Sequence, residues 1–560
     1  MRWVTASLAV AAVAAVAAAA AGQPLEGVWV TSSGAVDTSS TKAMVRDLVN
    51  GQMSDEQKVL AVFNWYRRVV YPHNYLAGDR RDVLRQINSY GNTLCGSHAA
   101  NLGWLMREAG FKTRCVYIYG GGHTFIEVFY GDGWHAVDPE TDFAVWSRGP
   151  KRHLISMDEL KADPTLLDHP EAEGRAKPWL FKAMKFPWTT RKKMADFCDD
   201  RKNGASKASM QWSSSVLKRM TIKDYFIQGV RSVRYSEVNA AYGGHVSDPD
   251  LMSIRLRPNE KLIRCWANEG KGRYILGQGF CGYPAHLLYG GGADENDEEV
   301  FPYVEPYRKD NYGIPALPVD RCYRYSGNGH LIWTPDLAAG ELTRAAGVQM
   351  DNLVLDKATG VLRPVEAGKP AVLIVPIRSS YALVWADVTG TFLRGSKDDV
   401  CRILVRKLVK ETVEGKVRKV WKLDPVWTSD QFGEHTADAG YGRRINGKYT
   451  YEIRIEMLAA SDVRKVGLKA VRFDHTFVNN WLVLPHLEPG ENTIRVRLAN
   501  PRLLKQVRLQ ITYEWAEGVG WKQPRRDVRE VTGAAFEYQL TAAGPKFPRM
   551  QRLTLEALPR

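Results

Sequence analysis

The chain has 560 residues, of which 44% are apolar and 17 are tryptophan, so it can bury several packed cores in about three to four domains. Its formal net charge of +15 favours attraction to anionic surfaces such as acidic polysaccharide, wall polymer or lipid head groups. The seven cysteines are widely spaced and include no C-x-x-C pair, which excludes a dense disulfide scaffold and a zinc site of that type. We expect neither a metal nor a cofactor.

The N-terminus predicts a secretory leader. Arg2 is followed by an uncharged, alanine-rich run from Trp3 to Gly22, which contains an A-x-A-like cleavage site at Ala19-Ala20-Ala21. A membrane anchor is the alternative, but the run is only weakly hydrophobic. We therefore expect residues 1–21 to be a signal peptide. The mature chain has no later run of 18 apolar residues, so we expect it to be secreted, periplasmic or at the cell surface, with no membrane span and no nucleic acid partner.

From about residue 28 to residue 181, helical and strand patterns alternate. A capping box at Ser54-Asp55-Glu56-Gln57 opens a helix that ends at Tyr71-Pro72. A second helix is predicted from Cys95 to about Ala109, with Gly110 as its C-terminal cap. Strands are predicted at about 113–119, 123–130 and 134–138. These elements predict one compact α+β domain over residues 22–185.

The rest of the chain is predicted to be rich in β-structure. A basic, serine-rich linker is expected over residues 186–218, and alternating strands follow, for example from Tyr449 to Met457 after the turn signal Asn446-Gly447. Leu256 to Arg264 and Leu487 to Arg495 share a turn-then-strand pattern, L-x-P-x-E-x-x-I-R. We expect two β-sandwich-like domains, over residues 219–370 and 371–560. They are predicted to position the N-terminal domain, and a fragment ending near residue 185 is expected to keep the chemistry.

Three residues of the N-terminal domain can supply a nucleophile, a base and an orienting carboxylate. Cys95 opens the second helix, His123 starts a strand, and Asp138 ends the next strand. A helix N-terminus lowers the pKa of a thiol, and its backbone N–H groups can stabilise an oxyanion. Cys95, His123 and Asp138 are therefore the predicted catalytic residues.

The hairpin between the two strands decides whether this triad can form. If residues 130–133 form a four-residue loop, so that Phe129 pairs with Trp134, Asp138 falls opposite Phe125, on the same sheet face as His123 and roughly 7–8 Å from it. A two-residue loop at 132–133 would move Asp138 too far away, and a three-residue loop would turn it to the other face. The triad thus predicts the register of the hairpin.

These residues resemble the transglutaminase-like superfamily. The resemblance covers Cys95 with the helix to Gly110, the strand through Cys115-Val116, His123 to Tyr130 and Trp134 to Pro139, within roughly residues 50–150. It implies a cysteine-protease-like fold in which Cys95 is the nucleophile, His123 the general base and Asp138 the orienting acid. Family members crosslink Gln to Lys, hydrolyse peptides or amides, or have lost activity. No family-type oxyanion Trp or Gln is recognisable upstream of Cys95, and Tyr75 and Tyr90 are the alternatives.

Neighbouring residues have structural and functional interpretations. Cys115 is expected to be a core strand residue and His135 to face away from the site. His98, one turn after Cys95, could tune the thiolate or only pack against the helix surface. Glu127 could bind a substrate ammonium or be a polar sheet residue. The acidic run from Asp294 to Glu299 lacks a recognised calcium-ligand spacing and is expected to be a solvated loop.

The predicted function is that of a secreted thiol enzyme, a cysteine peptidase or amidase or a transglutaminase-like acyltransferase. Cys95 would form a thioester with a peptide or amide carbonyl, and water or an amine would release the acyl group. Hydrolysis is favoured because water outcompetes amines unless a site excludes it. The alternative is an inactive transglutaminase-like scaffold or binding protein of the cell surface. The expected partners are a protein or peptide substrate and anionic polysaccharide or cell-wall material.

Overall fold

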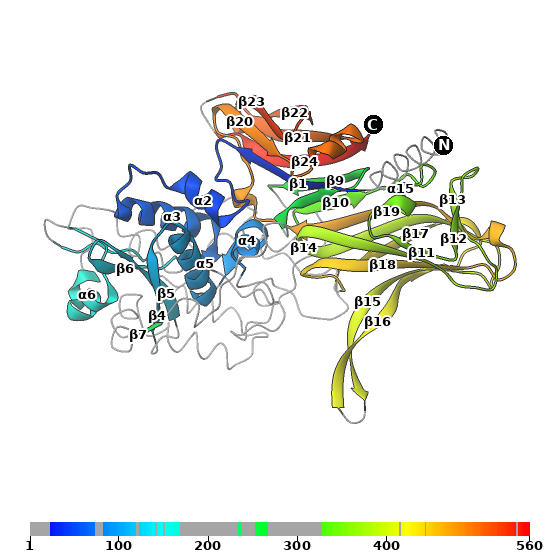
Figure 1. The fold of residues 1–560 in the computed structure, drawn as a ribbon, viewed down its shortest axis with the longest axis horizontal. Coiled ribbons are helices and arrows are strands. Elements are labelled where there is room, and N and C mark those ends of the chain that lie inside the picture. The colour runs from blue at the N-terminus through cyan, green and yellow to red at the C-terminus, as the bar shows by residue number, and fades with distance from the viewer. Residues whose placement is uncertain are drawn as a thin grey trace, which may run out of the picture.

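A computed structural model describes residues 23–72, 82–93, 95–118, 123–139, 143–148, 152–167, 233–236, 252–266, 327–413, 416–442, 444–544 and 547–560. Figure 1 shows a helical N-terminal part, coloured blue to cyan, beside a larger region of long strands. The predicted signal peptide and linker lie outside the described residues, as do Cys198, Cys281, Cys322 and the acidic run from Asp294 to Glu299. Among the described helices, none is both long and apolar enough to cross a membrane.

The N-terminal part combines helices with a small antiparallel sheet of order β6-β5-β4-β7. Its helices are α2 (Thr41–Leu48), α3 (Asp55–Val69), α4 (Val83–Arg85), the π-helix η1 (Gln86–Tyr90), α5 (Cys95–Glu108), α6 (Met157–Ala162) and the 3-10 helix η2 (Pro164–Leu167). Its strands are β2 (Tyr71–Pro72), β3 (Asn92–Thr93), β4 (Lys112–Ile118), β5 (His123–Tyr130), β6 (Gly133–Val137) and β7 (Val233–Ser236). Helix α5 packs against β4 and β5, so the described part confirms the predicted mixture of helices and strands.

Local signals fix the ends of the two main helices. At the start of α3, the Ser54 hydroxyl accepts the Gln57 N–H (3.2 Å) and the Gln57 side chain accepts the Ser54 N–H (2.8 Å), which confirms the capping box. At the end of α5, Gly110 has a φ of 94°, and the N–H groups of Gly110 and Phe111 donate to the carbonyls of Arg107 and Met106. This is a Schellman motif, which only a residue tolerant of the left-handed conformation supports.

Two strands, β1 and β7, pair with strands that are distant from them in the sequence. Strand β1 (Leu25–Ser32) pairs with β20 (Gly490–Arg497) and β8 (Ile254–Leu256), in a sheet of order β23-β20-β1-β8 whose outer strand β23 spans Ala535–Ala542. Strand β7, which follows the predicted linker, pairs with β4 at the edge of the N-terminal sheet. The predicted domain boundaries stay predictions, but backbone pairing crosses both ends of the range 22–185.

Among the described residues, the other long strands form one 14-stranded sheet. Its main path is β16-β15-β18-β14-β19-β10-β9-β24-β21-β22, with β11, β12, β13 and β17 attached. The strands of its first half are β9 (Glu260–Cys265), β10 (Gly329–Trp333), β11 (Gln349–Asp351), β12 (Leu353–Asp356), β13 (Val361–Pro364), β14 (Ala371–Arg394) and β15 (Val400–Val413). The others are β16 (Lys416–Thr428), β17 (Gly433–Tyr441), β18 (Lys448–Leu458), β19 (Gly467–Val478), β21 (Val507–Glu517), β22 (Gln523–Val531) and β24 (Arg549–Pro559). Short helices connect them: α15 (Glu341–Arg344), η4 (Val463–Lys465), η5 (Trp481–Val483), η6 (Pro501–Lys505) and η7 (Val519–Trp521).

This sheet confirms a large β-rich region after the N-terminal domain. Strands β9 and β10, from the predicted first β-domain, pair with β24 and β19 from the predicted second one. The two sides of residue 370 therefore share a sheet, and the sandwich arrangement stays a prediction. Strands β15 and β16 extend together from this sheet as a long hairpin (Figure 1).

The repeated sequence pattern has a common local structure. Asn259 and Gly490 occupy the same place in the two copies, directly after a proline, and both have positive φ, 58° and 96°. In each copy a strand starts at this point, β9 at Glu260 and β20 at Gly490. A proline followed by a residue of positive φ is typical of a type II turn, so the turn-then-strand prediction is confirmed at both places.

Candidate active site

Cys95 is the first residue of α5, as predicted, and it is half-buried. Four cysteines lie in the described residues, and all four are thiols rather than disulfide partners. The other three, Cys115, Cys265 and Cys401, are buried, and burial raises the pKa of Cys401 to about 12. Cys115 lies inside β4, which confirms it as a core strand residue. Within the described part of the chain, Cys95 is thus the thiol that a substrate can reach most easily.

The segment before Cys95 is held by the β-rich region. Helix η1 ends at Gly91, which has a φ of 61°, and β3 then pairs in parallel with β2. A Cβ atom on Gly91 would lie 2.5 Å from the side chain of Asn480, so glycine is required here for close approach as well as for φ. The predicted caps Asn92 and Thr93 form β3, and Leu94, between β3 and the helix, lies outside the described residues.

Asn480 makes the contacts that hold this segment. Its Nδ2 donates to the carbonyls of Val69 (2.9 Å) and Ile87 (2.6 Å), and its backbone N–H donates to the carbonyl of Asn88 (2.8 Å). The side chain is fully buried. One residue of the β-rich region thereby satisfies carbonyl groups near the ends of both α3 and η1. Sequence analysis missed Asn480, because nothing near it in the sequence indicates a contact about 390 residues away.

Tyr90 belongs to the same contact. The Tyr449 hydroxyl donates to the Tyr90 hydroxyl (2.8 Å), and the Arg85 guanidinium lies 3.9 Å from the centre of the Tyr449 ring. Tyr90 is fully buried. Its hydroxyl therefore contacts β18 of the β-rich region. Tyr75, the other alternative for an oxyanion side chain, lies outside the described residues.

The hairpin has the register that the triad requires. Phe129 pairs with Trp134, and Tyr130 also pairs with Gly133, which leaves a two-residue turn at 131–132 in which Gly131 has a φ of 59°. The turn is thus one pair tighter than the predicted four-residue loop, while the register is the same. Ile126 pairs with Val137, so the next position along the strand, Asp138, lies in line with Phe125. Positions 123 and 125 share one face of β5.

His123 and Asp138 occupy the predicted ends of their strands. His123 is the first residue of β5, where its backbone pairs with Ile118, and its side chain lies outside what the structure describes. Asp138 directly follows β6 and is fully buried. Its backbone exchanges two hydrogen bonds of 2.9 Å with Phe143, so the chain after β6 returns beside Asp138.

Glu127 has a structural role. Its carboxylate is fully buried, accepts the Arg114 Nε–H (2.6 Å) on one oxygen and accepts the backbone N–H of Met157 (2.7 Å) on the other. Burial raises the pKa of Glu127, and the bonds from Met157 and Arg114 oppose that rise. Since both oxygens are engaged within the protein, the polar sheet residue is the correct interpretation and the substrate-ammonium site is not.

Two histidines near the hairpin are also buried. His98 packs edge-to-face against Tyr66, with ring centroids 5.7 Å apart, and is therefore a core residue of α5. His135 stacks on Tyr130, with ring centroids 3.7 Å apart, and its two ring nitrogens lie within hydrogen-bond distance of the carbonyls of Leu154 and Tyr130. Burial lowers the pKa of His135. Across the described ranges, no group of three or more His, Cys, Asp or Glu side chains could hold a metal ion.

Comparisons with known proteins agree with the N-terminal prediction. Residues 42–139 match the model of the transglutaminase-like superfamily, and no curated protein matches the chain significantly. Among solved structures, the N-terminal tandem CBM22 domains of Paenibacillus barcinonensis Xyn10C align at 10% identity over 41% of this chain and 86% of their own, with a TM-score of 0.14. The glycoside hydrolase domain Endo-D (Spr0440) of Streptococcus pneumoniae R6 aligns at 10% identity over 41% of this chain and 31% of its own, with a TM-score of 0.12. These two scores are too low to support any argument. The family match includes Cys95, His123 and Asp138, and the segment 42–139 is a transglutaminase-like domain.

Proposed function

We propose that the protein is an exported thiol enzyme that cleaves or transfers acyl groups at peptide or amide bonds. His123 accepts the thiol proton of Cys95, and the Cys95 sulfur attacks the acyl carbon. His123 then gives that proton to the leaving amine, so that a thioester on Cys95 remains. Asp138 orients His123. Water, deprotonated by His123, releases the acid and restores the thiol.

The observation that carries the proposal is the register of the β5–β6 hairpin. Of the three loop lengths considered, only the pairing of Phe129 with Trp134 brings Asp138 to the sheet face of His123 and also close enough to reach it, and this is the pairing present. The position of Cys95 at the start of α5 gives further support, since the first N–H groups of a helix favour a thiolate and can bind an oxyanion. Cys95 is also the least buried of the described cysteines.

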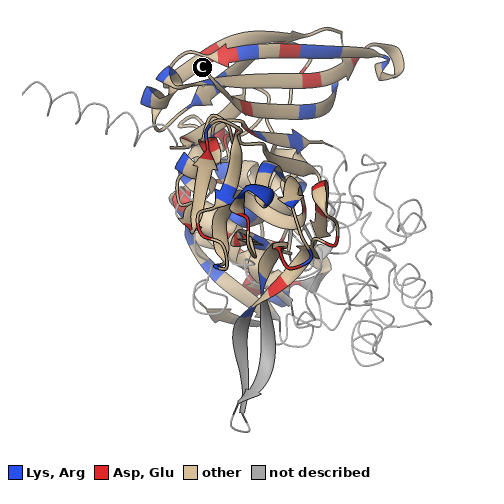
Figure 2. Cartoon of the chain, turned by 90° about the vertical axis from the view of Figure 1, so that its right-hand side faces the viewer, with Lys and Arg blue, Asp and Glu red and all other residues tan. Residues whose placement is uncertain are grey.

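Hydrolysis is the proposed outcome, and the β-rich region is proposed to hold the enzyme near an anionic polymer. With a net charge of +15, the chain is attracted to acidic material outside the cell. Figure 2 shows Lys and Arg interspersed with Asp and Glu over the ribbon of the described residues. The attraction is therefore expected to be general and to weaken with salt.

Turnover by matched variants tests the proposal. We expect Cys95→Ala to abolish release of acid from a protein or peptide substrate, and Asp138→Asn to lower it by about 10²- to 10⁴-fold. The control is Asp132→Asn in the exposed turn of the same hairpin, which should keep full activity. Incorporation of a fluorescent amine, measured in parallel, should be slower than hydrolysis. Equal activity of wild type and Cys95→Ala would contradict the proposal and favour the scaffold function.

A further inference from the structure

Arg264, in the middle of the β-rich region, carries a buried charge that no carboxylate neutralises among the described residues. It lies in β9, between β10 and β24, and only 3% of it is exposed. Its Nη1 donates to the Tyr381 hydroxyl (3.2 Å), whereas its Nε and Nη2 are buried without a hydrogen-bond partner in the described part of the chain. Glu260, on the same strand, accepts the backbone N–H of Arg257 instead.

Such an arrangement is unfavourable unless something else binds the guanidinium. Arginine does not lose its proton in proteins, so Arg264 cannot avoid the cost of burial by becoming neutral. A buried charge without a partner is strongly destabilising, and two unsatisfied N–H groups add to that cost. A water molecule could accept these hydrogen bonds but would leave the charge uncompensated.

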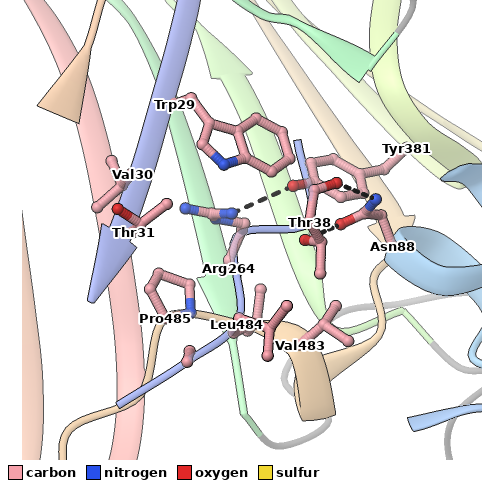
Figure 3. A pocket seen from close by; sticks show the side chains of 12 residues that line it. Trp29, Val30, Thr31, Thr38, Asn88, Arg264, Tyr381, Val483, Leu484 and Pro485 are labelled. Atoms are coloured by element: carbon pink, nitrogen blue, oxygen red, sulfur yellow. Dashed lines mark hydrogen bonds between the residues drawn. The ribbon is translucent and has the colours of Figure 1, made fainter. Parts of the chain in front are cut away.

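The guanidinium faces a small pocket. Figure 3 shows Arg264 beside Trp29 and Thr31 of β1, with Tyr381 and Asn88 on another side and Leu484 and Pro485 below. The space is small, so that only a water molecule or a small ion can enter it. Much of its wall is apolar and is formed by Trp29, Val30, Val483, Leu484 and Pro485. In such surroundings the attraction between unlike charges is much stronger than in water.

We propose that this pocket is a binding site for a small monovalent anion of the size of chloride, held by Nε and Nη2 of Arg264. The Tyr381 hydroxyl accepts a hydrogen bond from Nη1, so its own proton is available for the same anion. The proposal does not depend on the thiol chemistry of Cys95.

The position of the pocket gives the anion a structural role. Its walls come from β1, the π-helix η1, β9, β14 and the segment after η5, so it lies where the N-terminal part meets the β-rich region. Asn88, whose Oδ1 accepts the Thr38 hydroxyl (2.6 Å), lines the pocket seven residues before Cys95. A bound anion would therefore stabilise the same junction that Asn480 holds.

Thermal unfolding of the full mature chain at constant ionic strength tests the site. Chloride is exchanged stepwise for gluconate, which is too large to enter. We expect the unfolding midpoint of the wild type to rise with chloride and to saturate, as binding to the folded state alone requires. Arg264→Met should remove the chloride response. The matched control is Arg255→Met on β8, where Arg255 pairs with Glu26 (3.2 Å), and it should keep the response.

Crystals grown in bromide provide a second measurement that needs no variant. We expect an anomalous peak from bromide within hydrogen-bond distance of Arg264 Nε or Nη2. A water without an anomalous signal at that position would overturn it. A midpoint that rises equally with chloride in the wild type and in Arg264→Met would overturn it as well.

Discussion

Two carboxyl groups of the same hairpin, Asp138 and Glu127, are both fully buried, but their surroundings differ. Glu127 is engaged on both oxygens, by Arg114 and by the Met157 N–H, and serves to join β5 to β4 and α6. Asp138 lies at the end of the hairpin that is farther from its turn, in line with Phe125, two positions after His123. Glu127 is therefore a structural carboxylate, whereas Asp138 is the one proposed to orient the base.

Replacement of Glu127 should reduce stability. We expect Glu127→Ala to lower the free energy of unfolding by about 3 kcal/mol, because it removes the buried carboxylate that pairs with Arg114 and accepts the Met157 N–H, and leaves Arg114 only the exposed Asp158 (3.5 Å). Urea denaturation measures this change. In the control, Glu537→Ala, the lost pair with Arg495 is exposed on both sides, and the expected change is below about 1 kcal/mol. Similar losses in the two variants would contradict the structural role of Glu127.

At the scale of elements, the π-helix η1 connects Cys95 to the β-rich region. We expect Asn480→Ala to lower kcat while KM changes little, because the segment before Cys95 loses its support whereas the substrate contacts remain. The stability should also fall, by about 1–3 kcal/mol for each carbonyl left without a donor.

A matched control separates the effect of Asn480 on the position of Cys95 from its effect on the stability of the protein. Asn492 is equally buried, and its Nδ2 donates to the carbonyls of Glu488 and Gly490, within the β-rich region. Asn492→Ala should lose a similar amount of stability but keep kcat when both variants are assayed well below their unfolding temperatures. Equal kcat values for the two variants would contradict a positioning role for Asn480.

Strand β19 contributes a pH dependence to stability. His475 is buried, and desolvation lowers its pKa from 6.5 to about 4. Between these values the unfolded chain binds a proton that the folded chain does not, so stability should fall as the pH drops from about 6.5 towards 4, by up to about 3 kcal/mol. Urea denaturation at pH 7, 5.5 and 4.5 measures the free energy of unfolding. We expect this free energy to fall less with decreasing pH in His475→Gln than in the wild type. His153→Gln, at a partly exposed histidine, is the control.

The elements that the sequence predicts well are those with local signals. Ser54 with Gln57 marks the start of α3, Gly110 marks the end of α5, and the alternation of apolar residues marks β18, so these predicted ends agree with the structure to within a residue or two. The hairpin register could also be predicted, because side-chain alternation links it to the required face of Asp138. The pairing of β1 with β20 and the contact of Asn480 with η1 had no such signal, since each joins residues about 400 or more positions apart.

At the scale of the whole molecule, these distant contacts change what a truncated protein should do. A fragment ending near residue 185 would keep Cys95, His123 and Asp138 but lose β20 and β8, which pair with β1, and β7, which pairs with β4. It would also lose Asn480. We now expect such a fragment to unfold at a clearly lower temperature than the full chain and to lose most of its thiol reactivity. Circular dichroism and alkylation measure both, and an active, stably folded fragment would contradict the role given to the β-rich region.

In the proposed mechanism His123 activates Cys95, and the pH dependence of Cys95 alkylation shows whether it does. The rate of iodoacetamide labelling at Cys95 is measured from pH 5 to pH 9 in the wild type and in His123→Gln, with Cys95→Ala as the blank. We expect the labelling rate of the wild type to change little between pH 8 and pH 6, because a thiolate beside an imidazolium persists there. In His123→Gln the rate should fall about tenfold for each pH unit below an ordinary thiol pKa of about 8.5. Identical pH profiles for the two proteins, or an ordinary thiol profile in the wild type, would contradict the claim.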